Sequence, residues 1–190
     1  MPRAGSLPDA AWQTRHRAVM VMLWAHVVAI LLYAVYRGNS LGHVWVELSP
    51  VLMAALLAGF GLLGRGLSAV IAAGGLMVCS GVIVHLSGGM IEAHFHFFVM
   101  IPVIALYEAW PPFAIAVAYV LVHHGVVGTL NPRAVYDHPE AWERPWLFAG
   151  VHAAFFAFAC TACLVNWWPH ERARLAAGAE LLGHRAAACR

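Results

Sequence analysis

The sequence predicts an all-α protein that crosses a membrane several times. Of its 190 residues, 62% are hydrophobic and only 11% are charged, whereas soluble domains average about 25% charged residues. The mean hydropathy is +0.74. A spanning helix needs roughly 20 mostly apolar residues, so we expect a polytopic membrane helical bundle of six transmembrane helices. Their ranges are 18–36, 44–63, 67–86, 90–109, 111–130 and 147–168.

Turn-forming residues separate the six stretches. Glycine-rich or Pro-Pro breaks lie at 37–40, 64–66, 87–89 and 111–112, where such residues favour turns. Only residues 131–145 are numerous enough for a larger loop. The second stretch is the weakest, because an acidic residue and a proline lie near its start.

The first and last stretches divide the chain into three segments. The stretch 18–36 follows a polar leader and is too long for the core of a signal peptide, so we expect it to be retained. Beyond residue 168 the chain becomes charged and then rich in Ala, Leu and Arg. We therefore expect a cytoplasmic N-terminal leader over 1–17, a membrane domain over 18–168, and a cytoplasmic linker over 169–190 in which a signalling helix begins.

The arginines predict the orientation. Cytoplasmic loops of membrane proteins carry an excess of basic residues. With both termini in the cytoplasm, eight arginines lie inside and three lie outside, which favours this orientation in a bacterial inner (cytoplasmic) membrane. The inner ones are Arg3, Arg15, Arg17, Arg65, Arg172, Arg174, Arg185 and Arg190, and the outer ones are Arg37, Arg133 and Arg144.

Histidine is the unusual residue of this chain. There are twelve histidines against nine acidic residues, and the net charge of +2 with scattered basic residues does not suggest nucleic-acid binding. In the expected topology, most of the histidines within the spans lie in the outer half of the membrane. We expect cofactor-binding side chains in this layer: His26, His85, His94, His96, His123, His124 and His152.

A layer of histidines in hydrocarbon predicts a bound metal or haem. A single buried histidine is explained by a hydrogen bond between helices, but several neutral imidazoles need partners that Leu, Val and Phe do not supply. Imidazole binds iron, copper and zinc. Glu92 is a candidate for orienting a ligating ring. At the inner end of the fourth stretch, interfacial solvation is sufficient to explain Glu108.

Helical spacing limits which histidines can share an ion. His94 and His96 are two residues apart, which is about 200° around a helix, so they point to opposite sides and can serve two sites. His123 and His124 are about 100° apart, so they can flank one ion or divide between ligation and orientation. A haem needs one axial histidine, or two on opposite faces of the ring.

Three segments resemble a membrane sensor module of bacterial signalling proteins. They are HLSGGMIEAHFHFFVM over 85–100, YVLVHHGVVG over 119–128, and Asp-His-Pro over 137–139. Such modules precede diguanylate cyclase, histidine kinase or chemotaxis-transducer domains. The resemblance covers about 18–168 and implies a sensor that passes its signal through the last helix to a cytoplasmic output domain in related chains. It also implies a homodimer, because those output domains act in pairs.

A second, local resemblance is to subunit I of the haem–copper oxidases. The run Ala-His-Phe-His over 93–96 is similar to the paired-haem motif of that family, which implies that His94 and His96 ligate two different haems. The pair His123 and His124 is similar to the copper-ligand pair. The run His-Pro-Glu that begins at His138 is similar to the motif that supplies the third copper ligand in that family. The resemblance thus implies haem b (heme b), and copper held by histidines of these motifs.

The expected function is therefore an integral-membrane sensor domain that binds haem b and responds to redox state or a diatomic gas. One alternative is a membrane oxidoreductase or hydroxylase with a histidine-ligated copper, iron or zinc centre. Another is a copper-sensing domain without haem. The sequence does not decide whether the chain is an enzyme, although it favours a sensor. The expected metal ligands are His94, His96, His123, His124 and His138.

Overall fold

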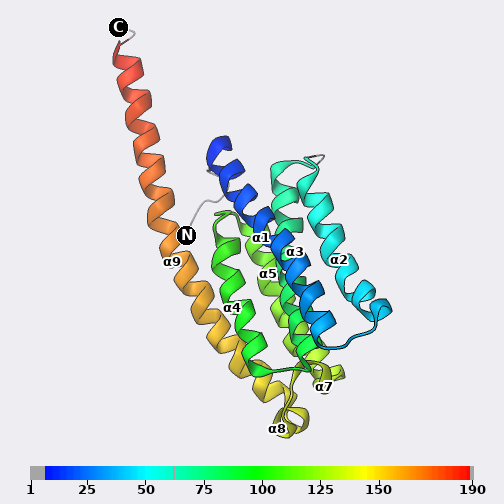
Figure 1. Cartoon of the computed structure of the whole chain (residues 1–190). Coiled ribbons are helices and arrows are strands. Elements are labelled where there is room, and N and C mark those ends of the chain that lie inside the picture. Colours follow the sequence, from blue (N-terminus) through cyan, green and yellow to red (C-terminus); the bar gives the residue numbers. More distant parts are fainter. Residues whose placement is uncertain (1–6, 62, 189–190) are drawn as a thin grey trace.

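The computed structural model describes the backbone of residues 7–61 and 63–188, and the side chains of these residues except 181–183, 185–186 and 188. Within this part of the chain the protein is helical and has no strand (Figure 1), as the sequence predicts. The elements are α1 (Asp9–Tyr36), α2 (Leu41–Gly59), α3 (Arg65–Ser87), α4 (Ile91–Ala105), α5 (Trp110–Leu121), the π-helical η1 (Val122–Val127), α6 (Gly128–Leu130), α7 (Pro132–Val135), α8 (Pro139–Glu143) and α9 (Pro145–Ala188).

Five of the described helical segments are long and apolar enough to cross a membrane. They are α1, α2, α3, the continuous run from α5 to α6, and α9 up to Glu180. Helix α4 has 15 residues, or about 22 Å at 1.5 Å per residue, which is less than the ~30 Å hydrocarbon core. It stops at Ala105 because residues 106–109 form a turn in which Glu108 has a positive φ of 46°. The expected count of six spans is therefore not confirmed.

The helices form an up-and-down bundle whose two ends differ. One end, called here the loop end, carries the α1–α2 and α3–α4 connections together with α7 and α8 (Figure 1). The other, called the terminal end, carries the start of α1, the α2–α3 and α4–α5 connections, and the projecting part of α9. Helix α1 begins at Asp9, well before residue 18, and α9 continues without a break through Pro169.

Helix α3 is the centre of the bundle. It packs against α1, α2, α4 and α5, and 67% of the residues in its most apolar 18-residue stretch are buried. Small residues allow this close packing. At Gly75, a Cβ atom would lie 2.9 Å from the Cβ of Ala54 on α2. Ser80 and Cys79 are also fully buried on α3.

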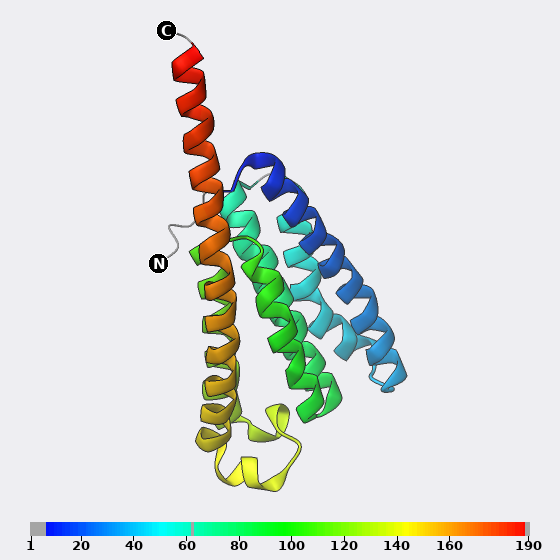
Figure 2. The ribbon, with the colours of Figure 1, turned by 90° about the vertical axis from the view of Figure 1, so that its left-hand side faces the viewer.

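Helix α9 lies at the edge of the bundle. It packs against α4, η1 and the short α6 and α8, and less closely against α5. Only 11% of the residues in its most apolar 18-residue stretch are buried. Its C-terminal turns extend past the terminal end of the other helices (Figures 1 and 2). Helix α9 therefore joins the loop end of the bundle to a segment outside it.

Candidate metal centre

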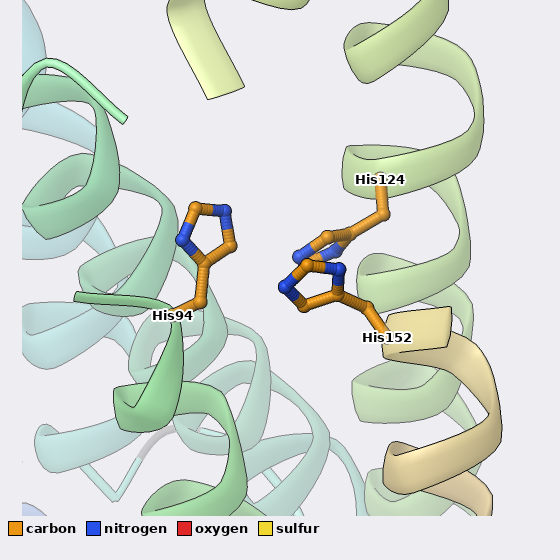
Figure 3. A group of neighbouring side chains, drawn as sticks. All are labelled: His94, His124 and His152. Carbon is orange, nitrogen blue, oxygen red and sulfur yellow. The ribbon is translucent and has the colours of Figure 1, made fainter. Parts of the chain in front are cut away.

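Three histidines from three helical segments meet near the loop end. They are His94 on α4, His124 on η1 and His152 on α9, called here the histidine trio (Figure 3). The ring centroids of each pair are 5.1–5.2 Å apart. His94 and His124 are buried, with exposed fractions of 1% and 4%. The structure thus brings together three of the residues that the sequence singled out.

Each ring of the trio is oriented by a carbonyl of its own helix. The Nδ1 atoms lie 2.9 Å from the Met90 oxygen for His94, 3.1 Å from the Val120 oxygen for His124 and 2.8 Å from the Phe148 oxygen for His152. A carbonyl oxygen only accepts hydrogen bonds, so each Nδ1 carries the proton and donates it. Each Nε2 therefore keeps its lone pair, which is the arrangement that metal-ligating histidines use.

The free lone pairs converge. One potential ligand nitrogen from each ring lies within 4.8 Å of those of the other two. Nitrogens that share a tetrahedral ion at about 2.0–2.1 Å are about 3.4 Å apart, so small side-chain rotations suffice to close the site. The Nε2 of His94 is buried and has no hydrogen-bond partner among the described residues. A bound cation would satisfy this atom.

Tyr136 covers the trio from the loop between α7 and α8. Its ring is parallel to that of His94 at 6.0 Å and lies 6.0 Å from that of His152. Burial raises the pKa of Tyr136 to about 12, so the phenol stays neutral. Close packing of its backbone against Gly89 and of its ring against Gly128 fixes its position. Tyr136 could not be identified from the sequence, because a tyrosine in a loop gives no signal of a role.

His96 faces away from the trio, as its separation of about 200° from His94 predicts. It lies between His26 and Ser80. The Nδ1 of His26 donates to the Met22 oxygen, so the Nε2 of His26 accepts from the Nε2 of His96 at 2.8 Å. The Nδ1 of His96 lies 2.8 Å from the Ser80 hydroxyl, which also lies 3.1 Å from the Leu76 oxygen. All ring nitrogens of His26 and His96 thus have hydrogen-bond partners, so neither ring has a free lone pair for a metal.

The remaining candidate residues lie outside the trio. His123 stacks on Tyr119, with its ring centroid 5.0 Å from that of His124. The Nε2 of His85 lies 3.5 Å from Oε1 of Glu47, away from the trio. His138 packs edge-on against Phe148 at 4.7 Å. Glu92 is exposed on α4, and backbone carbonyls take the orienting role expected of it.

Two apolar cavities adjoin the trio, one on each side of α9. One has a volume of about 350 Å³ and includes His124 and Trp146 in its lining. The other has a volume of about 470 Å³ and includes His152, His138 and four phenylalanines in its lining. Small apolar molecules thus have space next to two of the three candidate ligands.

A buried ion-pair cluster lies at the terminal end of the same helices. The Glu108 carboxylate, whose side chain is 7% exposed, accepts a hydrogen bond of 2.8 Å from Arg15 of α1. Arg174 of α9 donates to both of its oxygens. Burial alone would raise the pKa of Glu108, but hydrogen bonds from Arg174 and Arg15 hold it below the usual value. The expectation that interfacial solvation explains Glu108 is therefore wrong.

No family model and no solved structure matches the chain. Among curated proteins, the chain is similar to the transducer protein Htr8 of Halobacterium salinarum. The two are 38% identical over 192 aligned positions, which cover 95% of this chain and 30% of the relative. The chain thus spans less than a third of the length of the curated relative that it matches. The five long apolar helices indicate a membrane protein.

Proposed function

We propose that this chain is the membrane sensor region of a transducer-type signalling protein and that the histidine trio is its input centre. The trio binds one transition-metal ion. Two observations carry this proposal: three Nδ1-to-carbonyl hydrogen bonds, which leave each Nε2 with its lone pair, and ring nitrogens of the three residues that lie within 4.8 Å of one another. Hydrogen-bonded core histidines, such as His26 and His96, have no such free lone pair.

Copper fits this ligand set best. Imidazole suits copper and zinc, and among the divalent first-row metals copper binds nitrogen sites most tightly. Three protein ligands leave a coordination position open, as in zinc enzymes whose fourth ligand is water or substrate. Copper also changes oxidation state. A three-histidine copper centre would thus respond to copper itself, to redox state or to a small ligand such as a diatomic gas.

Haem b is the second candidate. Two axial histidines would have to lie on opposite faces of the macrocycle, but the three rings of the trio already contact one another, with centroids 5.1–5.2 Å apart. A porphyrin does not fit between them. The feature that favours haem is the 470 Å³ cavity lined by Phe95, Phe98, Phe155 and His152, in which His152 would be the axial ligand.

Helix α9 would carry the signal. It holds His152 near the loop end and Arg174 near the terminal end, 22 residues and about 33 Å along the helix. Helix α4 and the turn that follows it hold His94 and Glu108 at the corresponding two levels. An ion that draws His152 towards His94 would therefore shift α9 against its ion pair with Glu108. Such a shift requires a difference in contact energy between the two states of about a few kcal/mol.

The active form would be a homodimer in the lipid bilayer. The apolar residues Phe155, Phe158 and Val165 of α9 are 63–73% exposed, and α9 projects beyond the other helices. A second copy that packs against this face would bring two α9 helices together. A ligand-dependent shift would then change the geometry of a helix pair, which an output domain of a related chain can detect.

Metal binding is tested with purified protein in mild detergent, stripped with a chelator and titrated with Cu²⁺. We expect tight binding in the wild type and at least 100-fold weaker binding in the single variants His94→Ala, His124→Ala and His152→Ala. The matched control is His138→Ala, a nearby histidine outside the trio, which should bind as the wild type does. A Soret band in the unstripped protein that is lost only in His152→Ala would instead support haem.

Signal transmission is tested by hydrogen exchange. In the wild type, Cu²⁺ should change the protection of amides around Pro169 and Arg174 on α9. The variant Glu108→Gln should keep copper binding but lose this distant change. If copper alters protection only near the trio in the wild type, the proposed path through α9 is wrong.

A further inference from the structure

A second group of potential metal ligands comes from α2, which lies across the bundle from α9 (Figure 1), and from the end of α3. His43 and Glu47 are one turn apart on α2, and His85 lies in the last turn of α3. One ligand atom from each lies within 4.8 Å of the other two. None of these residues belongs to the trio.

The distances within this group suit a shared ion. The Nε2 of His85 lies 3.5 Å from Oε1 of Glu47. Two ligands of a tetrahedral ion with bonds of about 2.0–2.1 Å are about 3.4 Å apart, so these two atoms already have the required separation. The His43 ring has its centroid 5.5 Å from that of His85, and a modest side-chain rotation would complete the set.

The position of Glu47 also needs an explanation. It lies inside an apolar helix that is long enough to span a membrane, and its side chain is 23% exposed. Ionisable residues in such segments are costly and usually mark a functional site. A divalent cation would bind the Glu47 carboxylate and use one lone pair of each imidazole.

We propose that His43, Glu47 and His85 form a second divalent-cation site, which takes an ion of the zinc class. Imidazole ligands favour transition metals, whereas Mg²⁺ and Ca²⁺ require oxygen ligands. The His85 side chain is 43% exposed, so the ion exchanges with the water at the loop end. Because its ligands come from α2 and α3, the ion would tie these two helices together. The proposal does not depend on the function assigned to the trio.

The test is equilibrium dialysis of the full chain in detergent against Zn²⁺, with millimolar Mg²⁺ and Ca²⁺ present. Zn²⁺ binds three-histidine sites as well, so the wild type should take two ions. His94→Ala should keep one ion, at the second site. Glu47→Gln combined with His85→Ala should also keep one ion, at the trio. The matched control is Glu140→Gln, an exposed carboxylate at the same end, and it should keep both.

His94→Ala and the Glu47→Gln, His85→Ala variant each retain one intact site, so the ion that remains bound shows that each of these variants is folded. Adding Glu47→Gln and His85→Ala to His94→Ala should abolish binding. If His94→Ala binds no Zn²⁺, Glu47 and His85 form only an ion pair and the second site does not exist. If the trio is not a metal site, His94→Ala still binds one ion while the Glu47→Gln, His85→Ala variant binds none, so the two proposals fail separately.

Discussion

Replacing Glu108 by Gln is expected to destabilise the protein by about 2 kcal/mol. The change keeps the shape of the side chain but removes the charge that accepts hydrogen bonds from Arg15 and Arg174. A hydrogen bond to a charged group contributes about 1 kcal/mol more than a neutral one, and three such bonds are affected. The two arginine side chains are 29% and 27% exposed, so partial rehydration reduces the total from about 3 to about 2 kcal/mol.

Thermal unfolding in mild detergent measures this effect. For a chain of this size, about 2 kcal/mol lowers Tm by about 4–8 °C. The matched control is Glu92→Gln, an exposed glutamate on α4, which should change stability by less than about 0.5 kcal/mol. If Glu108→Gln lowers Tm no more than Glu92→Gln does, the ion-pair cluster does not hold α9 to the bundle.

The stability that Glu108 contributes to the fold should depend on pH. The pKa of Glu108 is lower in the folded protein than its usual value of about 4.3. The carboxylate therefore stabilises the fold above about pH 4.3, and this stability is lost as the pH falls through the folded-state pKa. The Tm gap between the wild type and Glu108→Gln should be constant from pH 6 to 8 and narrow below pH 4.3. A gap that widens in acid would contradict the assignment.

Two further predictions concern glycines and use neighbouring glycines as controls. Gly75→Ala should destabilise by about 1–3 kcal/mol, because the new Cβ would lie 2.9 Å from Ala54 and force α2 and α3 apart. A Cβ added at Gly74 would meet no atom within 4 Å, so Gly74→Ala should stabilise the protein by up to about 1 kcal/mol. Equal changes in Tm for Gly74→Ala and Gly75→Ala would refute this packing. Gly88 has a φ of +77°, and a Cβ added there would meet no atom within 4 Å. Gly88→Ala should therefore lower the free energy of unfolding by about 1–2 kcal/mol, through backbone strain alone. Gly89→Ala, with a φ of +85° and a Cβ 2.7 Å from the backbone of the Tyr136 segment, should cost clearly more in the same unfolding assay, and a smaller cost would contradict the close approach.

The helical character of the chain and the shared level of three histidines along the bundle could be predicted from the sequence, because both depend on position along a helix. Rise per residue is nearly constant, so the positions of His94, His124 and His152 along their stretches place them at one level. The sequence of one helix does not show which of its faces is turned towards each neighbouring helix. The sequence therefore places His94 and His96 on opposite sides of one helix, but it could not show which of the two faces His124 and His152 and which faces His26. The π-helical turns that carry His124 also depart from the regular 3.6-residue spacing.

Contacts between distant parts of the chain could not be predicted. Glu108 pairs with Arg15 and Arg174, which are 93 and 66 residues away, and nothing local to Glu108 indicates that it is buried. Likewise, His43 and Glu47 have the i, i+4 spacing of a chelating pair, but only the packing of α2 on α3 adds His85. Tertiary packing, which local periodicity does not encode, determines both groups.

X-ray absorption at the copper edge tests the central claim most directly. The sample is the His85→Ala variant loaded with one Cu²⁺ per chain, so that the second group does not contribute to the signal. We expect three imidazole nitrogens at about 2.0 Å around the copper, and the loss of this signal in a sample that also carries His94→Ala. A spectrum of oxygen ligands without imidazole scattering, or one unchanged by His94→Ala, would contradict the account.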